Sequence, residues 1–196
     1  MVSDLSEQIR RTSASLSVAR DDFPQWTEVG MADHSCAIHS MGVSYWTRLG
    51  NVLGYLAVSE LPPPPGGRYA HVGDDIRSDS VWFGRDDLSP AVVVEFERYG
   101  GAFDEAKLLG KVQNLLLAFH RWDGSPRIAV LSYWTKGLAT TPSHDLLKRR
   151  FIGGFETAAR ERVPGAHACE LLIWHTVLRE TSDGTWRLWQ MIERGG

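Results

Sequence analysis

Apolar residues recur at helical spacing between His34 and Glu60. A period of three to four residues places such positions on one face of a helix. The segment is followed by Pro62–Pro65, whose residues lack the amide donor that a helix needs, and by two glycines that free the backbone to turn. We therefore predict a helix over His34–Glu60, with these residues on its apolar face: Met41, Tyr45, Leu49, Val52, Leu53 and Leu56.

The pattern changes to β-strands after this break. Tyr69–His71 and Ser80–Phe83 are predicted as two strands joined by a polar turn at Gly73–Arg77. Ala91–Tyr99 contains three consecutive valines, residues that favour strands. These segments predict a β-meander that leads into a central strand, Ala91–Tyr99.

A second helix is expected from Asp104, a suitable N-cap residue, to Trp122. It ends at the turn-forming residues Asp123–Pro126. Its apolar face carries Leu108, Leu109, Val112, Leu115, Leu116 and Phe119.

The last part of the chain is predicted to contain both strands and a helix. We expect a strand at Arg127–Trp134, a helix at Ser143–Arg162, and a hairpin of two strands, Cys169–Leu178 and Trp186–Ile192. This order of elements favours an α/β fold with a mixed central β-sheet flanked by helices. The final strand is apolar on both faces, which suits a covered strand or a homodimer contact.

Length and composition set the domain organisation. The chain has 196 residues, of which 43% are hydrophobic, enough for one domain with a continuous core. Residues 1–25 are polar and only weakly periodic, so we expect an N-terminal arm there, mobile or laid on the surface as a short helix. Residues 26–196 are expected to form a single domain.

Charge and cysteine content narrow the function classes. The net charge of −3 gives no global attraction to nucleic acid, so any such contact must be local. Two isolated cysteines build neither a disulfide framework nor a four-thiolate zinc site. No apolar run is long enough to span a bilayer, and the N-terminus lacks a signal-peptide pattern. We expect a cytoplasmic protein without membrane contact.

Two carboxylates stand out on the valine-rich strand. Glu95 and Glu97 are two residues apart, so they project from the same face of the strand. Burying ionised groups costs several kcal/mol unless they are paired or bind a metal. Two interpretations remain open: a cation holds them, or both lie at an exposed strand end and pair with basic side chains.

Neighbouring residues favour the cation. Asp79 precedes a strand that should lie beside Ala91–Tyr99, so it adds a third carboxylate. Oxygen donors of this kind suit Mg²⁺ or Mn²⁺. Lys107 and Lys111 lie one turn apart on the following helix and could orient an attacking water or neutralise a scissile phosphate.

The residues of this region resemble the core of the PD-(D/E)xK, or restriction-endonuclease-like, superfamily. The likeness covers roughly residues 69–134 and is carried by Asp79–Phe83, Pro90–Glu97, Lys107, Lys111, Asn114 and Leu115. The resemblance implies that Asp79 and Glu95 bind metal. The superfamily's usual lysine position, two residues after the second acid, holds Glu97 here. Some members place this lysine on the next helix, where Lys111 or Lys107 could fill the role, with Glu97 as an added acid near the metal.

The resulting hypothesis is a Mg²⁺- or Mn²⁺-dependent nuclease that hydrolyses phosphodiester bonds, with DNA preferred to RNA as the partner. The missing strand lysine and the mildly acidic charge favour an alternative, a catalytically inactive relative that serves as a binding or regulatory module. A protein-interaction domain without a nucleic-acid role is the third reading.

Two further groups of residues are candidates for binding phosphate or metal. Lys148, Arg149 and Arg150 make the most basic stretch and are candidate phosphate contacts, with a solvated helix face as the alternative. Histidine and cysteine cluster near the start of the first predicted helix, but no second pair of ligands follows, and a helix start is the preferred interpretation there. The residues of that cluster are Asp33, His34, Cys36 and His39.

Overall fold

The computed structural model describes residues 2–32, 35–73 and 76–195. Its centre is a six-stranded sheet in the order β1-β2-β3-β4-β7-β8. The strands are β1 (Leu56–Leu61), β2 (Ser78–Phe83), β3 (Pro90–Arg98), β4 (Ile128–Lys136), β7 (Glu170–Glu180) and β8 (Trp186–Arg194).

The sheet is mixed. Strands β1, β2 and β3 form an antiparallel meander, β3 runs parallel to β4 and β4 to β7, and β8 returns antiparallel to β7. Parallel neighbours need a crossover connection, and α4 (Glu105–Arg121) and α5 (His144–Gly153) supply the two crossovers. The predicted mixed α/β architecture is confirmed, and so are the central position of β3 and its neighbours β2 and β4.

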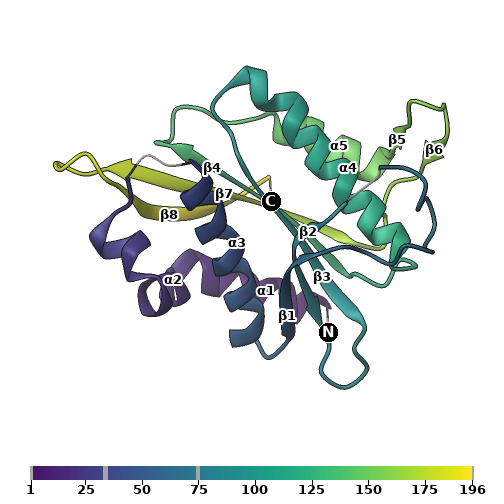
Figure 1. Cartoon of the computed structure of the whole chain (residues 1–196), viewed down its shortest axis with the longest axis horizontal. Helices are drawn as coiled ribbons and strands as arrows, with labels where there is room; N and C mark the ends of the chain where they lie inside the picture. Colours follow the sequence, from purple (N-terminus) through teal and green to yellow (C-terminus); the bar gives the residue numbers. More distant parts are fainter. Residues whose placement is uncertain (1, 33–34, 74–75, 196) are drawn as a thin grey trace.

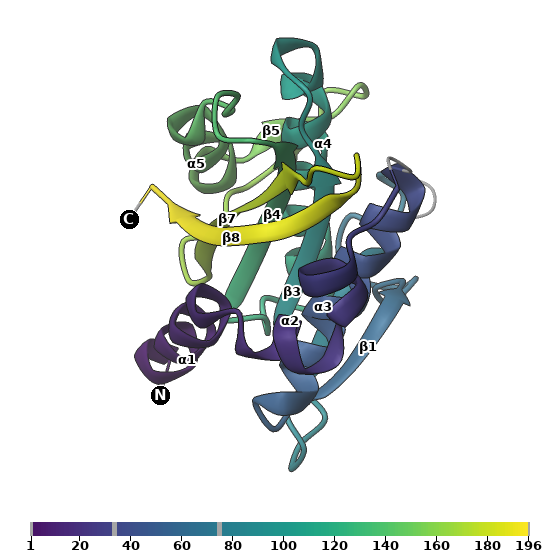
Figure 2. The ribbon, with the colours of Figure 1, turned by 90° about the vertical axis from the view of Figure 1, so that its left-hand side faces the viewer.

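Helices cover both faces of the sheet (Figure 1). On one side lie α1 (Val2–Ser15), α2 (Ser17–Asp22), the π-helical turn η1 (Gln25–Val29) and α3 (Ser35–Val52), and on the other lie α4 and α5. Each face has its own apolar core, because successive strand residues point to opposite sides. Figure 2 shows β8 crossing in front of the other strands, beside α1 and α2. Of the described helices, none is long and apolar enough to cross a membrane.

The N-terminal segment differs from the expected arm. Residues 2–22 form α1 and α2, and their apolar side chains belong to the core on the α3 side. Arg10 fixes α1 to the sheet by ion pairs of 2.6 Å with Glu170 and 3.0 Å with Glu193. The apolar residues of α1 are too few to give a clear helical period in the sequence. Among its described side chains, α1 buries a narrow stripe: Leu5, Ile9 and the small Ser6 and Ser13.

The first predicted helix was too long at its C-terminus. α3 ends at Val52, and Leu56–Leu61 is strand β1, the true first strand of the meander. Gly54, at φ +91°, allows the chain to turn between the two. Pairing with β2 prevails over the helical spacing of Leu53 and Leu56, since strand formation depends strongly on tertiary context.

The predicted strand at Tyr69–His71 is wrong, because these residues form turns. Their carbonyl groups are held by Arg121 on α4, which donates to the oxygens of Ala70 at 3.1 Å and Val72 at 2.7 Å. A guanidinium that collects carbonyl oxygens stabilises an irregular loop where no strand partner exists. Two residues of the predicted turn after it, Asp74 and Asp75, lie outside the described residues.

The predicted helix Ser143–Arg162 is also corrected. α5 ends at Gly153, and a small hairpin of β5 (Phe155–Glu156) and β6 (Arg162–Val163) follows. The chain returns so closely that a Cβ on Gly165 would lie 1.8 Å from the Ile152 carbonyl oxygen. The basic stretch Lys148–Arg150 therefore lies within a short helix.

Candidate metal centre

Asp79 and Glu95 come from adjacent antiparallel strands and lie on the α4 side of the sheet. The paired register of β2 and β3 ends at Ser80 and Val94, just before the two acids. Asp79 Oδ2 then accepts a hydrogen bond of 2.6 Å from the Phe96 backbone amide, in place of a ladder bond. Both carboxylates are buried, Glu95 completely and Asp79 to all but 4%. The prediction that the two acids converge on one face is confirmed.

The Lys111 side chain reaches these acids from helix α4. Its Nζ lies 2.6 Å from Glu95 Oε2, 3.8 Å from Asp79 Oδ2 and 4.0 Å from Glu97 Oε2. The helix rotation follows from the core, because Leu108, Val112 and Leu115 are fully buried and turn Lys111 toward the acids. The predicted orientation of this lysine is therefore confirmed.

Glu97 lies one residue pair further along β3, nearer to solvent. Its Oε1 accepts 2.7 Å contacts from the Arg98 backbone amide and from Lys107 Nζ. The Lys107 side chain is half exposed, whereas that of Lys111 is only 19% exposed. We call Asp79, Glu95, Glu97, Lys107 and Lys111 the acid–lysine cluster; it holds three carboxylates against two ammonium groups.

The protonation of the cluster reflects burial and mutual charge. Burial raises the pKa of Glu95 to about 8, against the opposing effect of Lys111 and with further repulsion from Asp79 and Glu97. Burial likewise raises the pKa of Asp79. Burial disfavours the charged form of Lys111, but Glu95 and Asp79 outweigh it and raise the pKa of the ammonium group. Lys111 is therefore a cation at neutral pH.

One oxygen of Glu95 has no partner. Oε2 is paired with Lys111, whereas Oε1 is buried and accepts no hydrogen bond from any described residue. A buried, unsatisfied carboxyl oxygen costs roughly 1–3 kcal/mol or more. A cation bound by Glu95 and Asp79 would remove this cost, and hard oxygen donors of this type fit Mg²⁺ or Mn²⁺.

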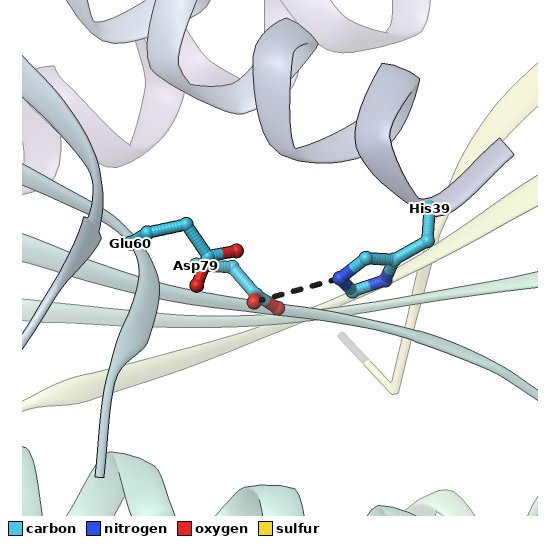
Figure 3. A group of neighbouring side chains, drawn as sticks. All are labelled: His39, Glu60 and Asp79. Atoms are coloured by element: carbon cyan, nitrogen blue, oxygen red, sulfur yellow. Dashed lines mark ion pairs between the residues drawn. The ribbon is translucent and has the colours of Figure 1, made fainter. Parts of the chain in front are cut away.

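A second set of ligands meets Asp79 from the other side (Figure 3). His39 on α3, Glu60 on β1 and Asp79 offer ligand atoms that all lie within 4.8 Å of one another. His39 Nε2 is 3.8 Å from Asp79 Oδ1, so the two oxygens of Asp79 face different neighbours. Asp79 thus belongs both to the acid–lysine cluster and to the group His39, Glu60 and Asp79, which could hold a metal ion.

Sequence reasoning missed Glu60 and misjudged His39. Glu60 was assigned to the end of a helix, whereas it lies on edge strand β1 opposite β2, at φ +53°. His39 was weighed only with its sequence neighbours, of which Asp33 and His34 lie outside the described residues and Cys36 is an exposed free thiol. A correct strand assignment for 56–61 would have placed Glu60 opposite Asp79 across the meander.

Other predicted residues lie apart from this centre. His71 contacts Glu161 at 2.5 Å. Lys148, Arg149 and Arg150 lie on α5, and no ion pair joins them to the acids among the described residues. A cavity of about 500 Å³ is lined by Asp4, Tyr55, Arg85 and Arg127 among others, and includes no member of the acid–lysine cluster.

No family model, curated protein or solved structure matches this chain. Function must therefore be inferred from the residues themselves. Near the middle of the sheet, the described chain combines a buried and incompletely paired glutamate, a buried aspartate and a protonated lysine. Such an arrangement can bind a divalent ion and place a cation beside an anionic substrate.

Proposed function

We propose that this protein is a divalent-metal-dependent nuclease of restriction-endonuclease-like fold. The observation that carries the proposal is the convergence of Asp79, Glu95 and Lys111, with Glu95 Oε1 buried and unpaired. Asp79 and Glu95 would hold Mg²⁺ or Mn²⁺, and Glu97 would add an acid near it.

The order of elements supports this fold. From α3 to β4 the chain forms a helix, a three-strand antiparallel meander, a crossover helix and a parallel strand. This order resembles the core of the PD-(D/E)xK superfamily, in which the acids lie on the second and third strands. Asp79 and Glu95 lie on β2 and β3. Lys111, on the crossover helix, would take the role of the lysine that the superfamily usually carries on the strand.

The chemistry follows from the charge states. A divalent ion at Asp79 and Glu95 would polarise a phosphoryl oxygen and lower the pKa of a bound water. Since Lys111 is protonated, it does not act as a base; it donates hydrogen bonds to the attacking water or to the scissile phosphate. The water oxygen forms the new bond to phosphorus and gives up a proton to solvent as the bond to the leaving oxygen breaks, and the leaving oxygen takes up a proton from solvent.

The substrate class is supported by local features, since the net charge is negative. Lys107 lies half exposed beside Glu97. Phe103, in the short 3₁₀ helix Ala102–Asp104 that follows β3, is fully exposed. An exposed aromatic side chain beside basic residues provides a surface for base stacking, so we propose a nucleic-acid strand, with DNA preferred, as the substrate.

A non-catalytic relative that binds nucleic acid is the second candidate. It is favoured by Glu97 at the usual lysine position and by the close Lys111–Glu95 pair, which neutralises Glu95 without a metal. The two candidates differ in one measurable property, because only the nuclease needs the ion.

The test uses melting curves and a cleavage assay on the same preparations. An ion that binds only the folded protein, at ten times its dissociation constant, contributes about 1.4 kcal/mol, a rise of roughly 2–4 °C in melting temperature. We expect Mn²⁺ to give this rise, alone or with a short oligonucleotide present, and to support cleavage. Glu95→Gln should abolish both effects with the folded state retained.

Glu180→Gln is the matched control, because Glu180 is exposed at the far end of β7. It should behave as the wild type in both assays. A wild-type melting temperature unmoved by millimolar Mn²⁺ with and without oligonucleotide, together with no cleavage, would sink the nuclease proposal. Retained oligonucleotide binding in that case would support the non-catalytic relative.

A further inference from the structure

A small cavity lies just beyond the carboxyl ends of β3 and β4. Its volume is about 120 Å³, and its lining comes from the residues that follow Glu97 on β3 and from the end of β4 with the loop after it. Open α/β sheets bind their ligands in this position, outside the carboxyl ends of parallel strands. The lining residues are Arg98, Tyr99, Gly100, Trp134, Thr135, Lys136 and Thr140.

The lining is cationic and hydroxylated. Arg98 and Lys136 contribute positive charge, Thr135 and Thr140 contribute hydroxyl groups, and no lining residue is a carboxylate. The acids nearest in sequence have other partners: Glu97 accepts from Lys107, and Asp104 accepts from the Gly100 amide at 2.6 Å. The chemistry of this cavity therefore favours an anion.

The guanidinium group of Arg98 is positioned to bind such an anion. Its guanidinium lies over the Trp134 ring, 5.6 Å from the ring centroid, and makes no ion pair with a carboxylate of the described chain. Stacking on an aromatic face holds a guanidinium in place and leaves its in-plane N–H groups available. Trp134 is itself buried, which makes the platform rigid. Paired N–H donors of this kind match the oxygens of a phosphate group.

The size of the cavity limits the ligand. Pockets for drug-sized or nucleoside ligands usually measure roughly 300–1,000 Å³, so about 120 Å³ admits a tetrahedral oxyanion but not a nucleobase with its sugar. Arg98 directly follows Glu97, and its amide donates to the Glu97 carboxylate. The Arg98 side chain points to the opposite face of the sheet from Glu97 and stacks on Trp134, which belongs to the core on the α3 side. An anion bound here thus lies at the end of the sheet, beyond the acid–lysine cluster.

The geometry points to a phosphate-binding subsite in this cavity, with Arg98 as its main contact, that holds a backbone phosphate of the substrate strand. The anion specificity stands on the cavity alone, whereas the assignment to a substrate phosphate rests on the proposed nuclease function. This subsite would position a strand across the end of the sheet without contacting its bases.

The first experiment measures inorganic phosphate binding by calorimetry, without divalent metal and with a chelator present. Arg98→Gln should weaken binding at least tenfold, and Glu95→Gln should leave it unchanged. Arg179→Gln is the matched control, because Arg179 also lies 5.6 Å from a tryptophan ring, that of Trp189, and is not among the residues that line the cavity. Equal phosphate affinity in the wild type and Arg98→Gln, or no phosphate binding by the wild type, would overturn the subsite.

The second experiment measures cleavage of an oligonucleotide with Mn²⁺. Arg98→Gln should raise KM about tenfold with kcat nearly unchanged, and should lower the salt dependence of binding by about one phosphate contact. Equal KM in the variant and the wild type would overturn the assignment to a substrate phosphate. If no protein cleaves but phosphate binding still depends on Arg98, the nuclease function fails and the anion subsite is supported.

Discussion

Two buried polar groups lie side by side on the α4 face of the sheet, and they differ in the kind of atom that each leaves unpaired. The acid–lysine cluster is one. The other, which we call the histidine network, consists of Tyr133, Thr135, His144, His175 and Arg194. The sheet register joins them, since Glu97, Tyr133 and His175 are aligned across β3, β4 and β7.

The central histidine of the network is fully satisfied. Arg194 donates to His175 Nδ1 at 3.0 Å, so Nε2 carries the proton and donates to Thr135 Oγ1 at 2.6 Å. Thr135 in turn donates to the Gly137 carbonyl. Both ring nitrogens of His175 are thus hydrogen-bonded within the core. His144 is half-buried, and its ring lies 2.8 Å from the Tyr133 hydroxyl.

The acid–lysine cluster is arranged differently. Like charges converge, one ammonium group is shared among three acids, and Glu95 Oε1 has no partner. The buried atom left unpaired in the histidine network is Arg194 Nε, on a side chain that already donates to His175. In the acid–lysine cluster it is a carboxyl oxygen, the kind of atom that binds a hard cation, and this difference separates the two groups.

The largest expected effect distinguishes the two groups by removing the shared cation. Lys111→Met should lower the free energy of unfolding by about 3 kcal/mol, because it leaves buried acids without their counter-charge. Urea unfolding at pH 9, above the Glu95 pKa of about 8, measures this loss. Millimolar Mg²⁺ should restore part of it, since an ion replaces the missing charge. A variant as stable as the wild type would mean that the acids are protonated and need no cation.

The second prediction concerns the histidine network and pH. Burial, with repulsion from Arg194, lowers the pKa of His175 to about 4 from its ordinary 6.5. Between these values the unfolded chain binds the extra proton and the folded protein does not, so stability is present above pH 6.5 and is lost as pH falls toward 4. The loss should be on the order of 2 kcal/mol.

NMR titration of the His175 ring and urea unfolding from pH 7 to pH 4 measure this effect. His167, which is exposed, is the internal control for the NMR titration. Protonation of His175 near pH 6.5 would show that the network is open to solvent and is not the rigid structural group inferred from its bonds.

The third prediction tests ion choice at the edge of the acid–lysine cluster. An imidazole nitrogen favours transition metals over Mg²⁺, so His39→Ala should weaken Mn²⁺ binding roughly tenfold, about 1.4 kcal/mol, and change Mg²⁺ binding little. Isothermal calorimetry with each ion measures both. His167→Ala is the control. An equal loss for both ions would mean that His39 orients Asp79 and does not bind the metal.

The smallest expected effect comes from Lys107, one turn from Lys111. Its side chain is half exposed, and exposed ion pairs contribute about 0–1 kcal/mol. Lys107→Ala should therefore change the free energy of unfolding by less than about 0.5 kcal/mol in urea titration. A loss as large as that of Lys111→Met would place Lys107 within the buried part of the cluster.

The sequence by itself determined the features that depend on local pattern. The alternation along β3 put Glu95 and Glu97 on one face, and the apolar positions of α4 turned Lys111 toward them. The mixed sheet, the central position of β3 and the convergence of Asp79 with Glu95 followed from element order. Each of these features depends on contacts between elements that are neighbours in the sequence and whose apolar residues follow a regular spacing.

Only the tertiary structure decided the features in which distant segments compete. Segment 56–61 has a helical spacing, but its pairing with β2 makes it a strand and brings Glu60 to Asp79. α1 is polar along most of its length, yet its ion pairs with β7 and β8 and a narrow apolar stripe hold it against the sheet. The unpaired Glu95 Oε1 was equally unpredictable, since whether a buried oxygen has a partner depends on the position of every side chain around it.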